Sequence, residues 1–308
     1  MRAALYQSQG SPVRVEEVPD PVPESGAIVR MAVASLNPLD GDLWCGRGGI
    51  KTPTPHIPGL EGAGYLDGKP VLVFGGGVGI VRSGTLAEQV AVPASCIYPI
   101  PDGVPLEHAA MCGAAGATAV RLVELAGATS SDHVLVLGAS GVIGTLVVSL
   151  LGNLGIRVTA QVRDISRAGP VQRARTRVIT MSQPRDMPAA VGAEAPTVII
   201  DPLGGQWSAA SIEVLAPRGR LINYATISGE AASIDMKSLY RKAATIRGYS
   251  GLGEPNEHQR CITAALERAR MGQLPLEVAR RFSLDDAAAA FACISSGAQG
   301  KTLIRIDA

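Results

Sequence analysis

The sequence lacks paired cysteines and long hydrophobic runs. Its five cysteines are odd in number and widely spaced, and none forms a CxxC pair. This excludes a disulfide framework and favours a reduced intracellular chain. No stretch reaches the roughly 18 uninterrupted apolar residues of a membrane-spanning helix, and the first residues contain no apolar core of a signal peptide. We therefore expect a cytoplasmic protein without a membrane span.

An excess of charge of one sign is also missing. The chain has 28 basic and 27 acidic residues, a formal net charge of +1, so nothing attracts it to nucleic acid or to a membrane surface. Hydrophobic residues make up 46% and charged residues 18% of the chain, as in globular proteins. Its 308 residues exceed one ordinary domain and predict two. A small-molecule substrate is the expected partner.

The composition and the apolar pattern of the sequence change near Gly116. Before it the chain is rich in Gly and Pro, with short β-type runs, which predicts a mostly antiparallel β domain over residues 1–115. After it apolar β runs alternate with helical stretches, which predicts a doubly wound parallel sheet over 116–253 and an α/β protein. The six predicted strands are 134–137, 157–162, 177–180, 197–201, 220–224 and 245–249.

The tail is predicted to return to the first domain. It contains a helical stretch at 256–271, helical apolar spacing over 282–296 and a closing β run at 301–306. We therefore assign 254–308 to the same domain as 1–115.

A glycine-rich loop marks the start of the second domain. HVLVLGASGVIG, residues 133–144, places Gly138, Gly141 and Gly144 between an apolar strand and a helical run. Small residues let backbone N–H groups and a helix N-terminus approach a pyrophosphate. A tight turn that binds nothing is the alternative. A second β run ending about 20 residues later favours dinucleotide binding.

The residues after that second run bear on the cofactor. Arg163 stands at its end and Arg167 follows one helical turn later. A 2′-phosphate requires cationic partners, whereas NAD enzymes usually have an acidic residue here. We expect NADPH rather than NADH, although Asp164 would favour NADH if the register shifted by one residue. Both arginines could instead be solvated surface residues.

Six ordered motifs extend over nearly the whole chain: SLNPLD at 35–40, IPGLEGAG at 57–64, GTLAEQVAVPA at 84–94, the glycine loop, DPLGG at 201–205 and LAPRGRL at 215–221. On these motifs the chain resembles the medium-chain dehydrogenase/reductase superfamily, in its zinc-independent quinone oxidoreductase-like branch. The resemblance implies a GroES-like catalytic domain and a Rossmann domain, with hydride transfer between cofactor and substrate.

The resemblance also bears on zinc. In the zinc-dependent branch a Cys and a His hold the metal, and here Asn37 and Leu60 occupy those positions. Leu60 cannot coordinate a metal, and catalytic zinc needs three protein ligands. Cys112 lies near a third ligand position, but a lone Cys is more often a small core residue. We therefore expect no zinc.

The resemblance assigns site residues one by one. Cofactor contacts are expected from Thr118, Gly138, Ser140, Gly141, Val142, Ile143, Gly144, Arg163, Arg167, Leu203, Tyr224, Ala225, Thr226, Tyr249, Ser250 and Gly251. Asn37 is expected to donate to the substrate carbonyl or the nicotinamide ribose, unless it only stabilises a turn before Pro38. Trp44 and His56 are candidates for the substrate pocket.

Each of these two residues has a plainer interpretation. Trp44 could simply pack, and His56 could be a solvated loop residue. His133 is interpreted as a turn residue and His258 as a residue on a helix surface. The tyrosines that often follow the Asn-containing motif in quinone reductases are missing, which leaves the acceptor open.

These features predict an NADPH-dependent reductase of a quinone or an α,β-unsaturated carbonyl compound. One alternative is a carbonyl reductase of the same superfamily with Tyr224 as acid. Another is a non-catalytic NADPH-binding sensor protein. The resemblance further implies a homodimer that pairs through residues 245–249.

Overall fold

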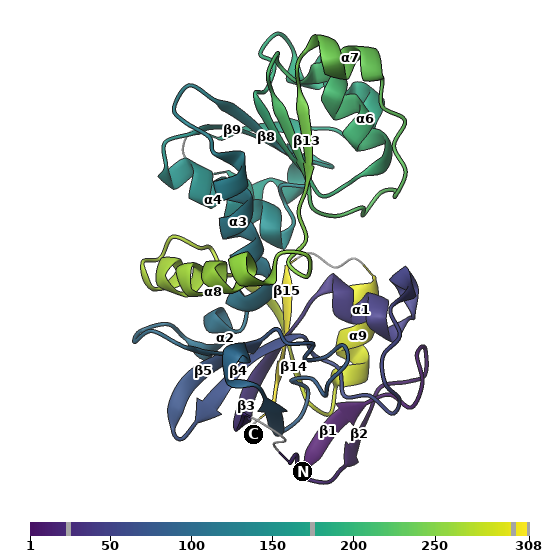
Figure 1. The fold of residues 1–308 in the computed structure, drawn as a ribbon, viewed down its shortest axis with the longest axis vertical. Helices are drawn as coiled ribbons and strands as arrows, with labels where there is room; N and C mark the ends of the chain where they lie inside the picture. Colours follow the sequence, from purple (N-terminus) through teal and green to yellow (C-terminus); the bar gives the residue numbers. More distant parts are fainter. Residues whose placement is uncertain (23–25, 173–175, 297–299, 307–308) are drawn as a thin grey trace. The chain divides into compact units, whose positions relative to one another are not determined.

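The computed structural model describes residues 1–22, 26–172, 176–296 and 300–306. The chain forms two compact units (Figure 1). Unit 1 comprises Met1–Ala117, Ile262–Gly272 and Leu276–Ala308, and unit 2 comprises Thr118–Cys261 and Gln273–Pro275. The sequence put the corresponding breaks at 115/116 and 253/254.

The described part of unit 2 is built on a six-stranded parallel sheet, in the order β10-β9-β8-β11-β12-β13. Its strands are β8 (His133–Val136), β9 (Arg157–Val162), β10 (Thr176–Thr180), β11 (Val198–Asp201), β12 (Arg220–Asn223) and β13 (Thr245–Gly248). Each lies within one residue of its predicted position. The predicted doubly wound Rossmann sheet is confirmed.

Helices cover both faces of this sheet. Figure 1 shows α3 (Ala117–Ala126) and α4 (Val142–Asn153) on one side, and α6 (Gly205–Val214) and α7 (Met236–Arg241) on the other. Strand residues such as Leu135, Ile199 and Leu221 share a buried cluster with residues of α6 and of the short α5 (Met187–Val191). Alternate strand residues point to opposite faces, so both faces are apolar, as in a sheet buried on both sides.

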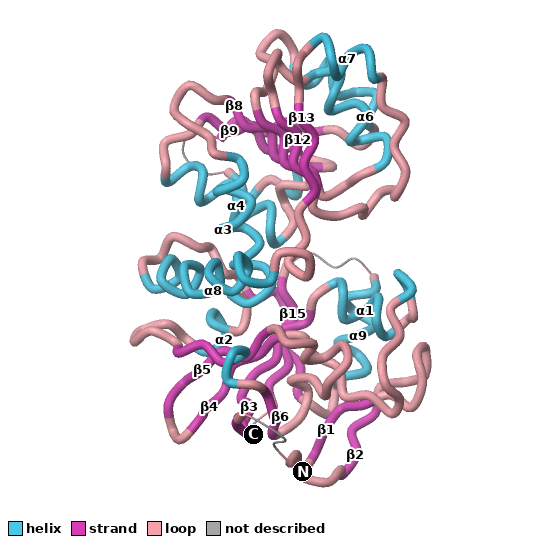
Figure 2. Tube along the Cα trace, viewed as in Figure 1, coloured by secondary structure: helices cyan, strands magenta, loops and turns pink. Residues whose placement is uncertain are grey.

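The described part of unit 1 contains a mostly antiparallel sheet in the order β14-β15-β3-β4-β5-β7, with β6 paired to β3, and a separate β1-β2 ribbon (Figure 2). The strands are β1 (Arg2–Leu5), β2 (Arg14–Glu17), β3 (Ala27–Leu36), β4 (Glu61–Leu66), β5 (Lys69–Phe74), β6 (Gln89–Val92), β7 (Ile97–Pro99), β14 (Val278–Ser283) and β15 (Lys301–Arg305). Among these described strands, only β14 and β15 pair in parallel. The closing strand therefore returns to the first domain, as predicted.

The described residues contain further helices and turns. They are α1 (Pro38–Trp44), α2 (Leu106–Ala109), α8 (Pro255–Arg270) and α9 (Ala287–Ser295), with 3-10 turns at Arg47–Gly49, Ala94–Cys96, Ile165–Arg167, Gly169–Val171 and Pro184–Asp186 and a π turn at Cys112–Gly116. Phe291 of α9 packs into the unit 1 core with Leu36 and Ile304. No helix in the described ranges is both long and apolar enough to cross a membrane.

The prediction of helical structure over 282–296 was wrong at its start. Phe282 and Ser283 end β14, and α9 begins at Ala287. Phe282 is one of the β14 residues paired with β15, opposite Ile304. Apolar spacing alone could not separate a strand followed by a helix from one longer helix, because the strand is only six residues long.

Candidate functional site

The SLNPLD motif turns the end of β3 into the start of α1. Asn37 is the N-cap of α1, and Pro38 occupies its first helical position, where the missing N–H costs nothing. The backbone nitrogen of Asn37 donates to Asp40 Oδ2 at 2.7 Å, and the nitrogen of Asp40 donates to the Asn37 carbonyl at 3.0 Å. These two backbone hydrogen bonds fix the turn.

The amide of Asn37 belongs to a buried polar group that we call the Asn37 cluster: Ser35, Asn37, Asp40, Glu61 and Lys301. Asn37 Nδ2 donates to Glu61 Oε1 at 3.0 Å and to the Ser35 carbonyl at 3.3 Å. Lys301 Nζ donates to Asn37 Oδ1 at 2.5 Å, to Glu61 Oε1 at 2.9 Å and to the Leu36 carbonyl at 3.2 Å. Both ends of the amide therefore have protein partners.

Glu61 is the centre of this cluster. Its side chain is fully buried and accepts from Ser35 Oγ at 3.0 Å as well as from Asn37 and Lys301. Its second oxygen accepts from the backbone nitrogen of Ala114 at 2.7 Å. A buried carboxylate needs a counter-charge and hydrogen bonds, and Glu61 has both.

Asp40 is a second buried carboxyl, 1% exposed. Its Oδ1 accepts from the backbone nitrogen of Leu60 at 3.1 Å. Burial, which outweighs its two backbone hydrogen bonds and the charge of Lys301, raises the pKa of Asp40 to about 7. Near neutral pH this carboxyl therefore changes its protonation state.

The donor set does not fit zinc. Leu60 is aliphatic and 6% exposed, and the Asn37 amide oxygen already binds the Lys301 ammonium. Burial, with the charge of Glu61 as a second cause, raises the pKa of the Cys112 thiol well above its ordinary range, which opposes the thiolate form that binds metals. The described residues contain no group of three or more His, Cys, Asp and Glu side chains that could hold a metal.

The two candidates for a substrate pocket both have structural partners. Trp44 Nε1 donates to the Ser11 carbonyl at 2.7 Å, and its ring meets Phe291 edge-on with centroids 5.6 Å apart. His56 is 3% exposed, so the expectation of a solvated loop histidine was wrong. Its Nε2 lies 3.0 Å from the Gly79 carbonyl, and burial lowers its pKa. A role in substrate binding stays a prediction for both residues.

The glycine loop joins β8 to α4 in unit 2. Gly138 has a φ of +57°, in the left-handed region that favours glycine. A Cβ on Gly144 would lie 2.7 Å from both Ala139 Cα and the Gly138 carbonyl oxygen, so the helix start has no room for a side chain. Gly141 is the N-cap of the 12-residue α4. The loop, with Ser140, Val142 and Ile143, therefore exposes a helix N-terminus to a ligand.

After the end of β9, the side chains of Arg163 and Asp164 differ in whether they have partners within the protein. Asp164 caps the 3-10 turn that follows, because its Oδ1 accepts from the Ser166 backbone nitrogen at 2.8 Å and from the Ser166 hydroxyl. Arg163 is exposed and Arg167 half-buried. Within the described chain neither guanidinium forms a hydrogen bond or an ion pair, so both remain available to an anion.

A pocket of about 450 Å³ opens at the carboxyl ends of β12 and β13. Its lining is Asn223, Tyr224, Ala225, Gly248, Tyr249, Ser250, Gly253 and Glu254. Four of the predicted cofactor contacts, Tyr224, Ala225, Tyr249 and Ser250, thus meet in one place, whereas Thr226 and Gly251 are outside this lining. Ligands of parallel α/β sheets bind at this edge.

Asp201 organises the neighbouring DPLGG turn. Its fully buried carboxylate accepts from the nitrogens of Leu203 at 2.7 Å and Gly204 at 3.2 Å, and from Ser208 Oγ at 2.5 Å. Desolvation, followed by the charge of Asp201, raises the pKa of Tyr224 well above its usual range. This phenol is therefore a hydrogen-bond donor and a weak proton donor.

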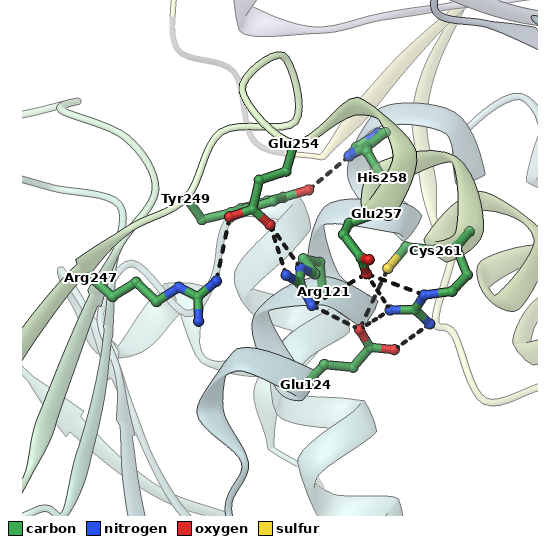
Figure 3. A network of polar contacts seen from close by, with 9 residues as sticks. Arg121, Glu124, Arg247, Tyr249, Glu254, Glu257, His258 and Cys261 are labelled. Atoms are coloured by element: carbon green, nitrogen blue, oxygen red, sulfur yellow. Dashed lines mark hydrogen bonds and ion pairs between the residues drawn. The ribbon is translucent and has the colours of Figure 1, made fainter.

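A network of polar contacts ties the pocket wall to α3 and α8 (Figure 3). Tyr249 OH lies 2.7 Å from His258 Nδ1, and burial raises the pKa of Tyr249 to about 12 although Thr118 hydrogen-bonds it. The Glu254 carboxylate accepts hydrogen bonds from Arg121 Nη2 at 2.7 Å and from Arg247 Nη2 at 3.4 Å. These contacts connect the segment after β13 to α3 and α8.

Two histidines lie elsewhere than predicted. His258 is 4% exposed, and its Nδ1 contacts the Tyr249 hydroxyl. His133, at the start of β8, is 2% exposed, and its Nε2 lies 2.8 Å from Thr159 Oγ1. The surface and turn interpretations were wrong, because each ring fills buried space beside a hydroxyl partner.

Several residues of these sites were missed. Asp40 and Glu61 stand inside the SLNPLD and IPGLEGAG motifs, and Lys301 is a charged residue directly before the apolar part of the closing strand, which is a signal that could have been used. Gln161 gave no such signal. Its Oε1 accepts from the Gly138 nitrogen at 2.8 Å, and its Nε2 donates to the Met181 carbonyl at 2.7 Å.

Comparisons with known proteins agree with this architecture. Residues 174–304 match the family described as zinc-binding dehydrogenase. The chain is 27% identical over 303 residues to the mitochondrial enoyl-[acyl-carrier-protein] reductase of Arabidopsis thaliana, covering 90% of this chain and 80% of that protein.

Two solved structures extend the similarity to the whole chain. The quinone oxidoreductase of Thermus thermophilus, solved also in complex with NADPH, is 26% identical with a TM-score of 0.80, covering 99% of this chain and 100% of that one. The yhdH oxidoreductase of Salmonella enterica, in complex with NADP, is 24% identical with a TM-score of 0.82 over 100% of both chains. From its motifs, its fold and these relatives, the chain belongs to the medium-chain dehydrogenase/reductase superfamily, in the quinone oxidoreductase and enoyl reductase-like branch.

Proposed function

We propose that the protein is a zinc-independent, NADPH-dependent reductase of a conjugated carbonyl compound, either a quinone or an α,β-unsaturated ketone, aldehyde or acyl group. The observation that carries the proposal is the Asn37 cluster. At the two positions where the zinc-dependent branch has ligands, this chain has an amide bound to a lysine and an aliphatic side chain.

The residues of unit 2 fit a dinucleotide. Gly138, with its left-handed φ, and Gly144, which has no space for a Cβ, allow the tight turn between β8 and α4. Backbone N–H groups at the N-terminus of α4 would bind the pyrophosphate. Within the described chain Arg163 and Arg167 are free to contact a 2′-phosphate, while Asp164 is engaged with Ser166. This arrangement supports NADPH over NADH.

The substrate class follows from the chemistry of Asn37 and Leu60, which stand where the zinc-dependent branch has ligands. These two side chains do not suit a metal. The bound cofactor would supply the hydride. In a quinone or enone the negative charge that develops is spread onto oxygen, and a neutral hydrogen-bond donor can stabilise it. An alcohol dehydrogenase would require a metal ion at that position. The enoyl and quinone reductases among the relatives support the same substrate class.

A side-by-side assay tests the proposal. Oxidation of NADPH is measured with a panel of quinones and enones and with the matching saturated ketones. We expect turnover of the conjugated acceptors only. Equal reduction of the saturated ketones would favour a carbonyl reductase with Tyr224 as acid, and tight NADPH binding without any turnover would favour a non-catalytic sensor protein.

Metal content is measured on the same preparation. We expect well under one zinc per chain by elemental analysis, and unchanged activity after treatment with a chelator. Stoichiometric zinc that is lost together with activity would contradict the zinc-independent mechanism.

We also propose that the protein is a homodimer joined through β13. This strand is the last of the six-stranded sheet, and its four residues are all exposed. Ile246, 43% exposed, is an apolar residue on this edge. Natural edge strands are usually covered or protected by charge, and a second copy would cover this one.

A further inference from the structure

We propose that Lys301 is a positioning residue that acts through the Asn37 amide, orienting and polarising one of its N–H groups toward the carbonyl oxygen of the substrate. This inference rests on the proposed function. It assigns to a lysine and an amide together the role that a metal ion has in the zinc-dependent branch.

The orientation of the amide follows from the chemistry of its partners. An ammonium group only donates hydrogen bonds, so the Asn37 atom that contacts Lys301 Nζ must be the oxygen. The Glu61 carboxylate only accepts, so the atom that faces Glu61 Oε1 must be the nitrogen. The two partners of opposite charge therefore hold the amide in a single orientation.

One amide hydrogen is held less firmly than the other. The bond from Nδ2 to Glu61 Oε1 is 3.0 Å long, close to the usual N–H···O distance, whereas the bond to the Ser35 carbonyl is 3.3 Å. The second hydrogen can be given to another acceptor at little cost. Asn37 retains 7% exposure, so its side chain is not completely enclosed.

Lys301 itself is poorly placed to contact a substrate. Its side chain is 4% exposed, and its three hydrogens match three acceptors, namely Asn37 Oδ1, Glu61 Oε1 and the Leu36 carbonyl. A donor bound to an amide oxygen draws electron density from the nitrogen and strengthens its N–H groups as donors, most of all in a buried site. The positive charge of Lys301 thereby strengthens the hydrogen bond that the Asn37 amide donates to the substrate.

The test is a mutant cycle in a Glu61→Gln background, because Lys301→Met alone would leave a buried carboxylate without its cation. In that background Asp40, whose carboxyl interacts electrostatically with Lys301, remains as the acidic group near the lysine. The four proteins carry Glu61→Gln alone, with Lys301→Met, with Asn37→Ala, and with both. The kcat and KM for an accepted enone or quinone, the NADPH affinity and the melting temperature are measured for each. Arg305→Met, an exposed change on the same strand, is the control for β15.

We expect Lys301→Met to lower kcat by about 10- to 100-fold with little change in KM or NADPH affinity, less than the roughly 100- to 1000-fold loss on removing an oxyanion donor outright. Once Asn37 is alanine, the same change should have almost no further effect. The proposal would be overturned if the kcat losses from Lys301→Met and Asn37→Ala multiplied in the double variant. It would also be overturned if the kcat losses changed in parallel with the melting temperature.

A second measurement does not depend on activity. In protein labelled with ¹⁵N-asparagine, the Asn37 side-chain amide is assigned by its disappearance in Asn37→Ala. Its protons should resonate further downfield in Glu61→Gln than in Glu61→Gln/Lys301→Met. Equal shifts would overturn the polarisation even in an active enzyme, whereas a wild type that reduces no acceptor would contradict the proposed function and leave this comparison intact.

Discussion

Asp40 Oδ1 lies 3.1 Å from the backbone nitrogen of Leu60, so the first turn of α1 is bound directly to the residue before β4. The other oxygen of the same carboxyl accepts from the Asn37 nitrogen. One buried carboxyl thus fixes, relative to each other, the two positions that hold metal ligands in the zinc-dependent branch.

The first prediction concerns the pH dependence of stability. The pKa of Asp40 is about 7 in the folded chain, above its ordinary value of 3.8, so the folded chain keeps a proton that the unfolded chain has released. The contribution of Asp40 to the free energy of unfolding therefore falls as pH rises from about 4 to about 7, by up to ~1.4 kcal/mol per pH unit, and is constant above this range.

Asp40→Asn should remove this slope. Urea unfolding of wild type and variant at about pH 5, 6, 7 and 8 measures the difference between their free energies of unfolding. That difference should shift in favour of the variant up to about pH 7 and then level off. Asp42→Asn, an exposed change on the same helix, should show no such trend, and parallel curves for Asp40→Asn would refute the prediction.

The second prediction compares two glycines of α4. Gly144→Ala should lower the free energy of unfolding by about 1–3 kcal/mol, because the new Cβ would meet backbone atoms at 2.7 Å. It should also weaken NADPH binding, since the loop must shift. A Cβ added at Gly152 would have no heavy atom within 4 Å, so Gly152→Ala should stabilise the helix by roughly 0.5–1 kcal/mol. Chemical denaturation gives both values, and effects of equal sign would contradict the close packing of the loop.

The third prediction concerns the choice of cofactor. Charged hydrogen bonds contribute about 1.5–3 kcal/mol, so Arg163→Ala should weaken NADPH binding by roughly 10- to 150-fold and leave NADH binding nearly unchanged. Titration calorimetry with both nucleotides measures this. Arg157→Ala, at the opposite end of β9 and paired with Glu194, is the matched control.

Two results would contradict this assignment. Equal losses for NADPH and NADH after Arg163→Ala would show that the residue supports the fold instead. A wild-type preference for NADH would point to Asp164 as the residue that contacts the ribose.

The fourth prediction concerns the β13 edge. If two copies pair there, Ile246→Lys should introduce a charge into the interface and shift the protein from dimer to monomer. Sedimentation velocity over a range of concentrations measures the shift. Arg268→Lys, a conservative change on α8, should leave the association unchanged, and a wild type that is monomeric throughout would refute the dimer.

Local patterns in the sequence were sufficient to predict the parallel sheet, the order of its elements and the position of the glycine loop. The apolar run Val198–Ile200 belongs to a fully buried strand. Gly144 is required by a steric contact with Ala139, only five residues away along the chain. The residues that carry such signals are close to one another in sequence.

The chemistry of the Asn37 cluster and the environments of the histidines, by contrast, depend on contacts between distant segments. Lys301 and Glu61 are 240 residues apart and meet because β15 and β4 both pair with β3. Whether Asn37 donates freely, and whether His56, His133 or His258 is solvated, depends on which side chains arrive from elsewhere in the chain. The identity of a polar residue fixes the bonds it can make, and the fold fixes which of them it makes.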